Sequence, residues 1–150
     1  MQKEMVWLII GVAVAYLLLE ETIMSTGDSL LDKWAQAIQR MEGWTPTSLS
    51  KRNNNPGNIK AGSQPWQGQV GVDSRGFVIF DSYENGIRAL KIILTNAATG
   101  QSTIYHPTDT LYDFFGKYAP DADSNNSRQY AQYVANSIGV SPDTPISQLV

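Results

Sequence analysis

The sequence predicts a mainly helical α+β domain with one small β-hairpin, preceded by an N-terminal transmembrane helix. Three observations support this fold class. Apolar residues recur at helical spacing in four separate stretches, each bounded by capping residues or glycine. Two short runs of strand-forming residues flank a turn sequence at residues 73–76. An unbroken apolar run, residues 5–19, stands near the start of an otherwise polar chain.

Residues 5–19 predict a membrane anchor. As a helix this run spans roughly 22 Å, which is less than the ~30 Å hydrocarbon core of a bilayer, and local thinning of the bilayer covers the difference. Trp7 and Tyr16 lie near its ends, where interfacial aromatic residues are typical. We therefore expect an uncleaved anchor in residues 1–21. A cleaved signal peptide and a buried helix of the domain are the two alternatives.

The charges around the anchor predict its orientation. Lys3 and the terminal amine precede the apolar run, and acidic residues directly follow it. The positive-inside tendency then places the N-terminus in the cytoplasm, or on the equivalent side of a viral membrane. Residues 22–28 are expected to be a linker. Residues 29–150 form the folded domain, which would face the periplasm.

The folded domain is expected to begin with a helix over residues 29–41. Ser29 and Asp32 resemble a capping box, and Gly43 is a natural stop. The apolar stripe of this helix consists of Leu30, Leu31, Trp34, Ile38 and Met41. Residues 45–63 are rich in Asn, Ser, Pro and Gly and predict a loop.

The rest of the domain is expected to contain a hairpin followed by three helices. The strands are predicted over residues 69–72 and 77–80. Asp81 and Glu84 form a capping-box-like start to the next helix. The three helices are expected between residues 81 and 100, over 110–118 and over 127–138. Pro145 is expected to begin a last turn.

Composition excludes several classes of function. The chain has 150 residues, a net charge of −3 and no basic block, so we expect no nucleic-acid partner. It has no cysteine, which excludes disulfides, a thiol nucleophile and thiolate metal sites. The single histidine, His106, leaves no cluster with metal-ligand spacing. We therefore expect neither a metal nor another cofactor.

Glu42 is the candidate catalytic residue because of its position at the end of the first predicted helix. Unpaired carbonyls there carry partial negative charge, and Trp44 offers an apolar wall if it folds back. Both effects disfavour a carboxylate, so the pKa of Glu42 should be raised. A carboxyl that keeps its proton near neutral pH is suited to act as a general acid in glycosidic bond cleavage. The alternative is a solvated glutamate at a frayed helix end.

A polar turn with the sequence Arg-Asn-Asn-Asn-Pro-Gly-Asn-Ile, residues 52–59, begins ten residues after Glu42. Its amides suit the acetamido and hydroxyl groups of amino sugars, and Gly57 lets the backbone pass close to a ligand. A structural turn whose asparagines bond their own backbone would explain the same residues. The residues alone leave both interpretations open.

Several motifs carry a resemblance when they are taken in order along the chain. Besides the 52–59 turn, which is the most specific part, they are Ile38, Glu42, Gly43, Gly76, Phe77, Phe80, Gly86, Ala89, Tyr118, Ala119, Pro120 and Tyr130. Over residues 29–150 they resemble lysozyme-like phage proteins, lytic transglycosylase domains that open peptidoglycan during delivery or release of the genome. Membrane-containing tailless phages carry such an enzyme on their internal membrane, and the predicted anchor is similar to that arrangement.

The resemblance implies a lysozyme-like fold that cuts the MurNAc-GlcNAc β-1,4 bond of peptidoglycan with Glu42 as the catalytic residue. It implies substrate contacts by Asn55, Gly57, Asn58, Tyr118 and Tyr130, with core packing as the alternative for Tyr130. The implied partners are peptidoglycan glycan strands, a lipid bilayer around residues 5–19, and other membrane proteins of the virion. Trp66 either stacks on a sugar or packs against the domain.

The chemistry implied by the resemblance needs only one carboxyl. Glycosidases with two carboxyls place them about 5 to 9 Å apart, and the candidates for a partner are Asp73, Asp81 and Glu84, none of them in the asparagine turn. With Glu42 alone, the 2-acetamido group of the substrate would stabilise C1, and the C6 hydroxyl would close a 1,6-anhydro ring. A hydrolase of the same fold and a virion protein that only binds glycan are the alternatives.

Overall fold

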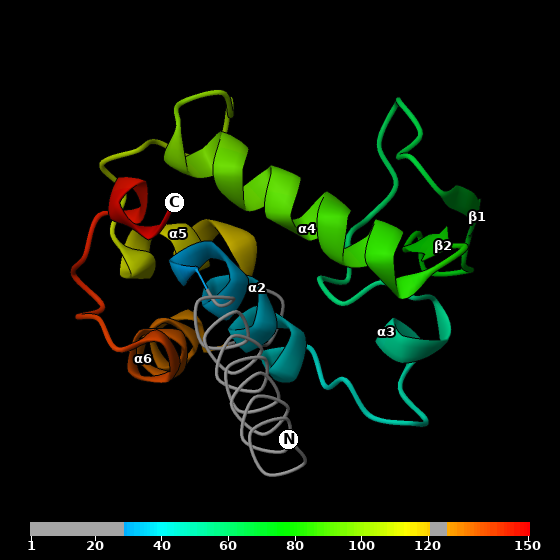
Figure 1. Cartoon of the computed structure of the whole chain (residues 1–150), viewed down its shortest axis with the longest axis horizontal. Coiled ribbons are helices and arrows are strands. Elements are labelled where there is room, and N and C mark those ends of the chain that lie inside the picture. Colours follow the sequence, from blue (N-terminus) through cyan, green and yellow to red (C-terminus); the bar gives the residue numbers. More distant parts are fainter. Residues whose placement is uncertain (1–28, 121–125) are drawn as a thin grey trace, which may run out of the picture.

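The computed structural model describes residues 29–120 and 126–150, and within them the chain is mainly helical with one two-stranded antiparallel sheet (Figure 1). The elements in chain order are α2 (Leu30–Met41), α3 (Leu49–Arg52), β1 (Gln69–Val72), β2 (Val78–Phe80), α4 (Tyr83–Ala98), α5 (Leu111–Tyr118), α6 (Ser127–Ile138) and the 3-10 helix η2 (Ile146–Leu149). The prediction of a mainly helical domain with one small hairpin is therefore confirmed.

The predicted anchor, residues 1–21, and the linker, residues 22–28, lie outside the described residues. Among the residues that the structure does describe, no helix is both long enough and apolar enough to cross a bilayer.

Local capping explains where the helices begin and end. The Ser29 hydroxyl accepts from the Asp32 backbone N–H at 3.1 Å, as expected at the start of α2. Gly43 after α2 and Gly139 after α6 have φ values of 73° and 77°, a left-handed conformation that favours glycine. The cap of α4 differs from the prediction by one residue, because the Ser82 hydroxyl accepts from the N–H at position 85.

The predicted loop over residues 45–63 contains a short helix, α3, which the composition did not indicate. Its single turn is capped by Ser48, whose hydroxyl accepts from the Lys51 backbone N–H at 3.3 Å. One hydrogen-bonded turn has little apolar periodicity, so a pattern based on spacing cannot detect it.

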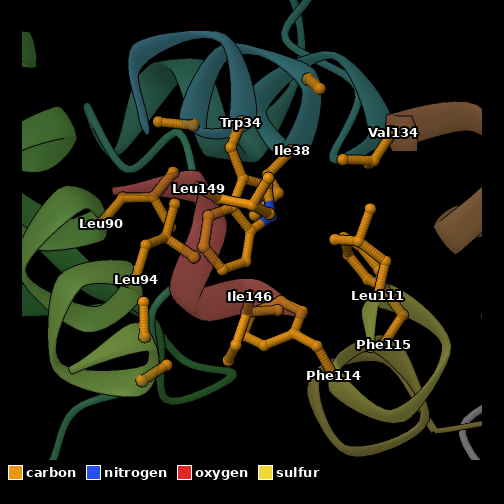
Figure 2. Packing of buried hydrophobic residues seen from close by; sticks show 14 of the residues in the cluster. Trp34, Ile38, Leu90, Leu94, Leu111, Phe114, Phe115, Val134, Ile146 and Leu149 are labelled. Carbon is orange, nitrogen blue, oxygen red and sulfur yellow. The ribbon is translucent and has the colours of Figure 1, made fainter. Parts of the chain in front are cut away.

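Trp34 lies at the centre of the helical core. It is fully buried and contacts Phe114 of α5 edge to face, with ring centroids 4.9 Å apart. Figure 2 shows the leucines of α4 on one side of this indole and residues of α5 and α6 on the other, with Ile146 of η2 near Phe114 below it. The buried side chains that Figure 2 labels are Trp34, Ile38, Leu90, Leu94, Leu111, Phe114, Phe115, Val134, Ile146 and Leu149.

The hairpin and α3 pack at the N-terminal end of α4, away from the helical core around Trp34 (Figure 1). The strands pair Val72 with Val78 and Gln69 with Phe80, with a register irregularity between them. Gly86 of α4 marks the tightest contact with this region. A Cβ at Gly86 would collide with the Asn54 carbonyl oxygen and would lie 2.9 Å from Pro56 Cδ. The asparagine turn is therefore pressed directly against the α4 backbone.

Replacement of glycine by alanine should have opposite effects on stability at Gly86 and at Gly116. Gly86→Ala should lower the free energy of unfolding by about 1–3 kcal/mol, because the turn must move away from α4. Gly116→Ala in α5 should raise it by roughly 0.5–1 kcal/mol, because alanine favours helix and nothing lies within 4 Å of the new methyl group. Urea unfolding of the full chain measures both. Equal effects of the two substitutions would contradict the packing described here.

Candidate active site

Glu42 caps the C-terminus of α2. Its backbone N–H donates to the Ile38 carbonyl at 2.9 Å, and the following Gly43 N–H donates to the Arg40 carbonyl at 3.1 Å. Figure 1 shows the chain continuing from this point to α3 beside the sheet. The carboxyl of Glu42 is thus carried by the rigid end of a core helix.

Asn58 is the hydrogen-bond partner of this carboxyl. The Asn58 amide nitrogen donates to Glu42 Oε2 at 2.7 Å. Asn58 has a φ of 46°, a left-handed conformation that asparagine tolerates better than most residues. The contact joins the end of α2 to the asparagine turn, two segments that are 16 residues apart in the sequence.

Two opposing effects set the proton affinity of Glu42. Burial raises its pKa above the ordinary value of 4.5, because a half-buried carboxylate loses hydration, and the hydrogen bond from Asn58 partly opposes this rise. The direction agrees with the expectation from sequence, but the cause differs in one respect. The Trp44 ring packs on Tyr83, with centroids 5.4 Å apart, and is not part of the cleft wall that contains Glu42.

Asn55 holds the asparagine turn from inside. It is fully buried, and its amide nitrogen donates to the carbonyls of Ile59 and Val78 at 2.9 and 3.0 Å. Its amide oxygen accepts from the Ile59 N–H at 2.8 Å. The expected substrate contact by Asn55 is therefore corrected, because burial and three internal hydrogen bonds make this amide a structural group.

The two asparagines before it attach the turn to the hairpin. Asn53 donates from its side chain to Asp73 Oδ2 at 2.9 Å. Asn54 donates from its side chain to the Phe80 carbonyl at 3.1 Å and has a φ of 50°. For residues 53–55 the structural interpretation of the turn therefore holds, and among the asparagines of the turn only Asn58 faces the carboxyl.

Gly57 brings the turn against α4 and α5. Its carbonyl accepts from the Tyr118 hydroxyl at 2.7 Å, and a Cβ at this position would lie 2.8 Å from a methyl group of Leu90. Burial raises the pKa of Tyr118 well above 10.0, and the neighbouring charge of Glu42 acts in the same direction. The hydroxyl of Tyr118 therefore stays protonated and serves as a permanent donor to the turn.

A cleft of about 1000 Å³ opens beside Glu42. Its walls come from the turn and the segment after it, from Phe77 of the hairpin, from the C-terminal part of α4 with the following loop, and from the end of α5. Of the expected site residues, Glu42, Gly57, Asn58 and Tyr118 line this cleft. Trp66 also lines it and packs partly against the core, so its packing against the domain is confirmed, and its stacking on a sugar stays a prediction.

Tyr130 of α6 lies near the site but does not line the cleft. Its ring packs against Phe115, with centroids 5.9 Å apart. The charge of Glu42 adds to the burial that raises the pKa of Tyr130, so the two side chains are close enough to interact electrostatically. Packing behind the site accounts for its position.

The three candidate partner carboxyls lie elsewhere. Asp73 accepts from the backbone N–H groups of Arg75 and Phe77 at 2.9 and 3.0 Å and stabilises the hairpin turn. Asp81 accepts a hydrogen bond from the side chain of Asn85. Glu84 is exposed on the side of α4 that lines a different pocket. None of the three lines the cleft, so among the described residues Glu42 is its sole acidic group.

Two kinds of lining residue were not expected from the sequence. Tyr105 lies in the loop after α4, packs on Phe114 with centroids 4.7 Å apart, and has its pKa raised by burial to about 12. Lys60 and Lys117 also line the cleft, and the charge of Lys117 is paired with that of Asp109 at 2.6 Å. No periodicity or motif distinguishes these positions, because the contacts across the cleft join loops distant in sequence. Among the described residues no cluster of His, Asp or Glu could hold a metal ion.

Comparison with known proteins gives one informative similarity. The chain is 32% identical over 104 residues to Protein P5 of Pseudoalteromonas phage PM2, and the match covers 63% of this chain and 61% of that protein. The chain thus matches less than two thirds of the length of that relative. No family model matches the chain, and no solved structure matches it.

The raised pKa of Glu42 predicts a pH-dependent stability difference between the wild type and Glu42→Gln. The folded state holds this proton more tightly than the unfolded chain, so the stabilisation is complete below the unfolded pKa and is lost as the pH rises through the folded value. A neutral glutamine does not undergo this loss. We therefore compare the free energies of unfolding of the two proteins in urea at pH 4 and pH 7. The stability of the variant relative to the wild type should be greater at pH 7, by about 1.4 kcal/mol for each tenfold difference in proton affinity between the folded and unfolded states.

Carboxyls with lowered pKa, such as Asp32 and Asp109, lose stabilisation on acidification in both proteins and cancel in the difference. A stability difference that is the same at both pH values, or larger at pH 4, would show that the pKa of Glu42 is not raised.

Proposed function

We propose that the chain is a lytic transglycosylase with a lysozyme-like fold, which cuts the β-1,4 bond between MurNAc and GlcNAc in peptidoglycan. The observation that carries this proposal is the half-buried carboxyl of Glu42, with a raised pKa, on a cleft that has no second carboxyl among its described residues. A cleft of about 1000 Å³ is large enough for several sugar units of a glycan strand.

The first step is cleavage of the glycosidic bond. Glu42 donates its proton to the glycosidic oxygen, the bond from C1 to that oxygen breaks, and the GlcNAc side leaves with a free hydroxyl. The carbonyl oxygen of the substrate's 2-acetamido group forms a bond to C1 and balances the positive charge there. Burial of Glu42 serves this step, because it keeps the carboxyl protonated before the reaction.

The second step returns the proton. The carboxylate of Glu42 accepts the proton of the C6 hydroxyl, the C6 oxygen attacks C1, and the bond from the acetamido oxygen to C1 breaks. The product carries a 1,6-anhydro ring, and Glu42 is protonated again. Asn58 serves this step, because its amide at 2.7 Å stabilises the carboxylate between the two proton transfers.

Tyr118 and Gly57 act on the geometry of the site. The hydroxyl of Tyr118 holds the Gly57 carbonyl at 2.7 Å, one residue before Asn58. This contact positions the Asn58 amide relative to Glu42, so Tyr118 is a positioning residue for the acid.

The proposed setting is a phage that must pass the cell wall. The similarity to a protein of phage PM2 supports a phage origin, and the order of motifs resembles phage transglycosylase domains. The apolar run at residues 5–19 would tether the enzyme to an internal virion membrane or to the host membrane on its periplasmic face. Glycan strands and lipid are then the partners, together with other membrane proteins of the virion.

Digestion of purified peptidoglycan by the full chain in a mild detergent tests the proposal. The wild type should release muropeptides with 1,6-anhydro ends, and Glu42→Gln should lose about 10²- to 10⁴-fold of the rate. Glu84→Gln makes the same chemical change outside the cleft and should retain full activity. Mass spectrometry of the products gives both the rate and the type of end.

Three results would overturn parts of this proposal. Reducing muramic ends in place of anhydro ends would identify a hydrolase. Equal activity of the wild type and Glu42→Gln would remove Glu42 from the mechanism. Binding of glycan without any cleavage would leave a structural virion protein that recognises the wall.

A further inference from the structure

Phe77 lies on the cleft wall, and two cationic side chains contact its ring. Lys60 Nζ is 5.7 Å from the centroid of its ring, and Arg75 Cζ is 5.1 Å from the same centroid. Both cationic residues are exposed, whereas Phe77 is half-buried. Lys60 and Phe77 line the same cleft as Glu42, so the cluster of Lys60, Arg75 and Phe77 borders the site proposed to bind glycan.

The backbone fixes the cluster in place. Lys60 and Phe77 are directly opposite each other in an antiparallel bridge. The bridge is flanked by hydrogen bonds of 2.9 Å from Ala61 N–H to the Gly76 carbonyl and from Val78 N–H to the Ile59 carbonyl. The Asn55 side chain donates to the carbonyls of Ile59 and Val78 next to this bridge, so the cluster and the asparagine turn are held by the same group of contacts.

Neither Lys60 nor Arg75 forms an ion pair with another described residue. The ion pairs among the described residues join Lys91 to Asp32 and Lys117 to Asp109. Hydrogen bonds to the Asp73 carboxyl, that from the Phe77 N–H foremost, lower its pKa, and the charge of Arg75 adds to this effect. No ion pair joins the two side chains, however, and the Asp73 oxygens accept from backbone and amide N–H groups. In a chain with a net charge of −3, Lys60 thus stands on the cleft wall without an ion-pair partner among the described residues, and Arg75 lies on the same ring of Phe77.

We propose that Lys60, Arg75 and Phe77 form a subsite for the stem peptides of peptidoglycan, which makes the enzyme prefer peptide-bearing strands over naked glycan. Stem peptides start at the lactyl group of MurNAc and carry free carboxylates together with alanine methyl groups. Lysine and arginine bind carboxylates through charge-assisted hydrogen bonds, and the ring of Phe77 offers an apolar surface to the methyl groups. The inference rests on the proposed function, because it places a glycan strand in the cleft.

Binding of the full chain to two polymers tests the subsite. One polymer is purified sacculi free of other anionic wall polymers, and the second is the same material after an amidase has removed the stem peptides. The Glu42→Gln background prevents cleavage during co-sedimentation. Adding Lys60→Gln and Arg75→Gln together should weaken binding to intact sacculi roughly tenfold, because each exposed charge contributes roughly two- to fivefold. Binding to stripped strands should not change.

A matched control makes the same change of charge elsewhere. Lys33 and Arg88 are exposed, and neither lines the cleft. The pair Lys33→Gln and Arg88→Gln in the same background should leave binding to both polymers unchanged. Equal weakening by the two pairs would show a nonspecific effect of net charge and would overturn the subsite.

The outcomes separate the subsite from the enzyme activity. If the Lys60 and Arg75 substitutions weaken binding to both polymers equally, or to neither, the subsite is wrong even when the wild type cleaves peptidoglycan. If the wild type cleaves neither polymer but the difference in binding persists, the subsite stands and the transglycosylase activity is wrong.

Discussion

The buried amide of Asn55 is the interaction on which the site depends. A primary amide inside a protein is costly unless its polar atoms are paired, and here the surrounding backbone satisfies both its nitrogen and its oxygen. The pairing fixes the path of the turn and joins it to the hairpin. Gly57 is thereby pressed between Leu90 and Tyr118, and Asn58 is directed at Glu42. Asn55 does not itself line the cleft, yet it holds the turn that brings Asn58 to the proposed acid.

Burial and hydrogen bonding act in opposite directions on Glu42, and the proposed chemistry uses both. With burial alone, the Glu42 carboxyl would bind its proton tightly, and the carboxylate that remains after proton transfer would be poorly stabilised. The amide of Asn58 lowers the cost of the charged state without removing the rise in pKa. One group can then act first as an acid and later as a base, provided that its pKa stays within reach of the working pH. The absence of another acidic lining residue in the described part of the chain is compatible with this single-carboxyl scheme.

The sequence predicts the regular elements well, because each depends on local signals. The apolar stripe from Leu30 to Met41 and the glycine stops at 43 and 139 correspond to observed helix bounds. The site was only partly predictable. Glu42 and Asn58 can be predicted because helix ends and polar turns are visible in the sequence. The structural role of Asn55 cannot, because its burial depends on a strand 23 residues away. Tyr105 and Lys60 join the cleft through tertiary contacts that no spacing encodes.

The pKa of the Glu42 side chain itself tests the central claim most directly. Carbon-detected NMR titration of the full chain should place it above 4.5 in the wild type. Asn58→Gly tolerates the left-handed backbone at this position and removes the amide, so it should raise the pKa further. A wild-type pKa at or below 4.5, or a pKa that falls when the amide is removed, would contradict the account of a buried acid held in balance by Asn58.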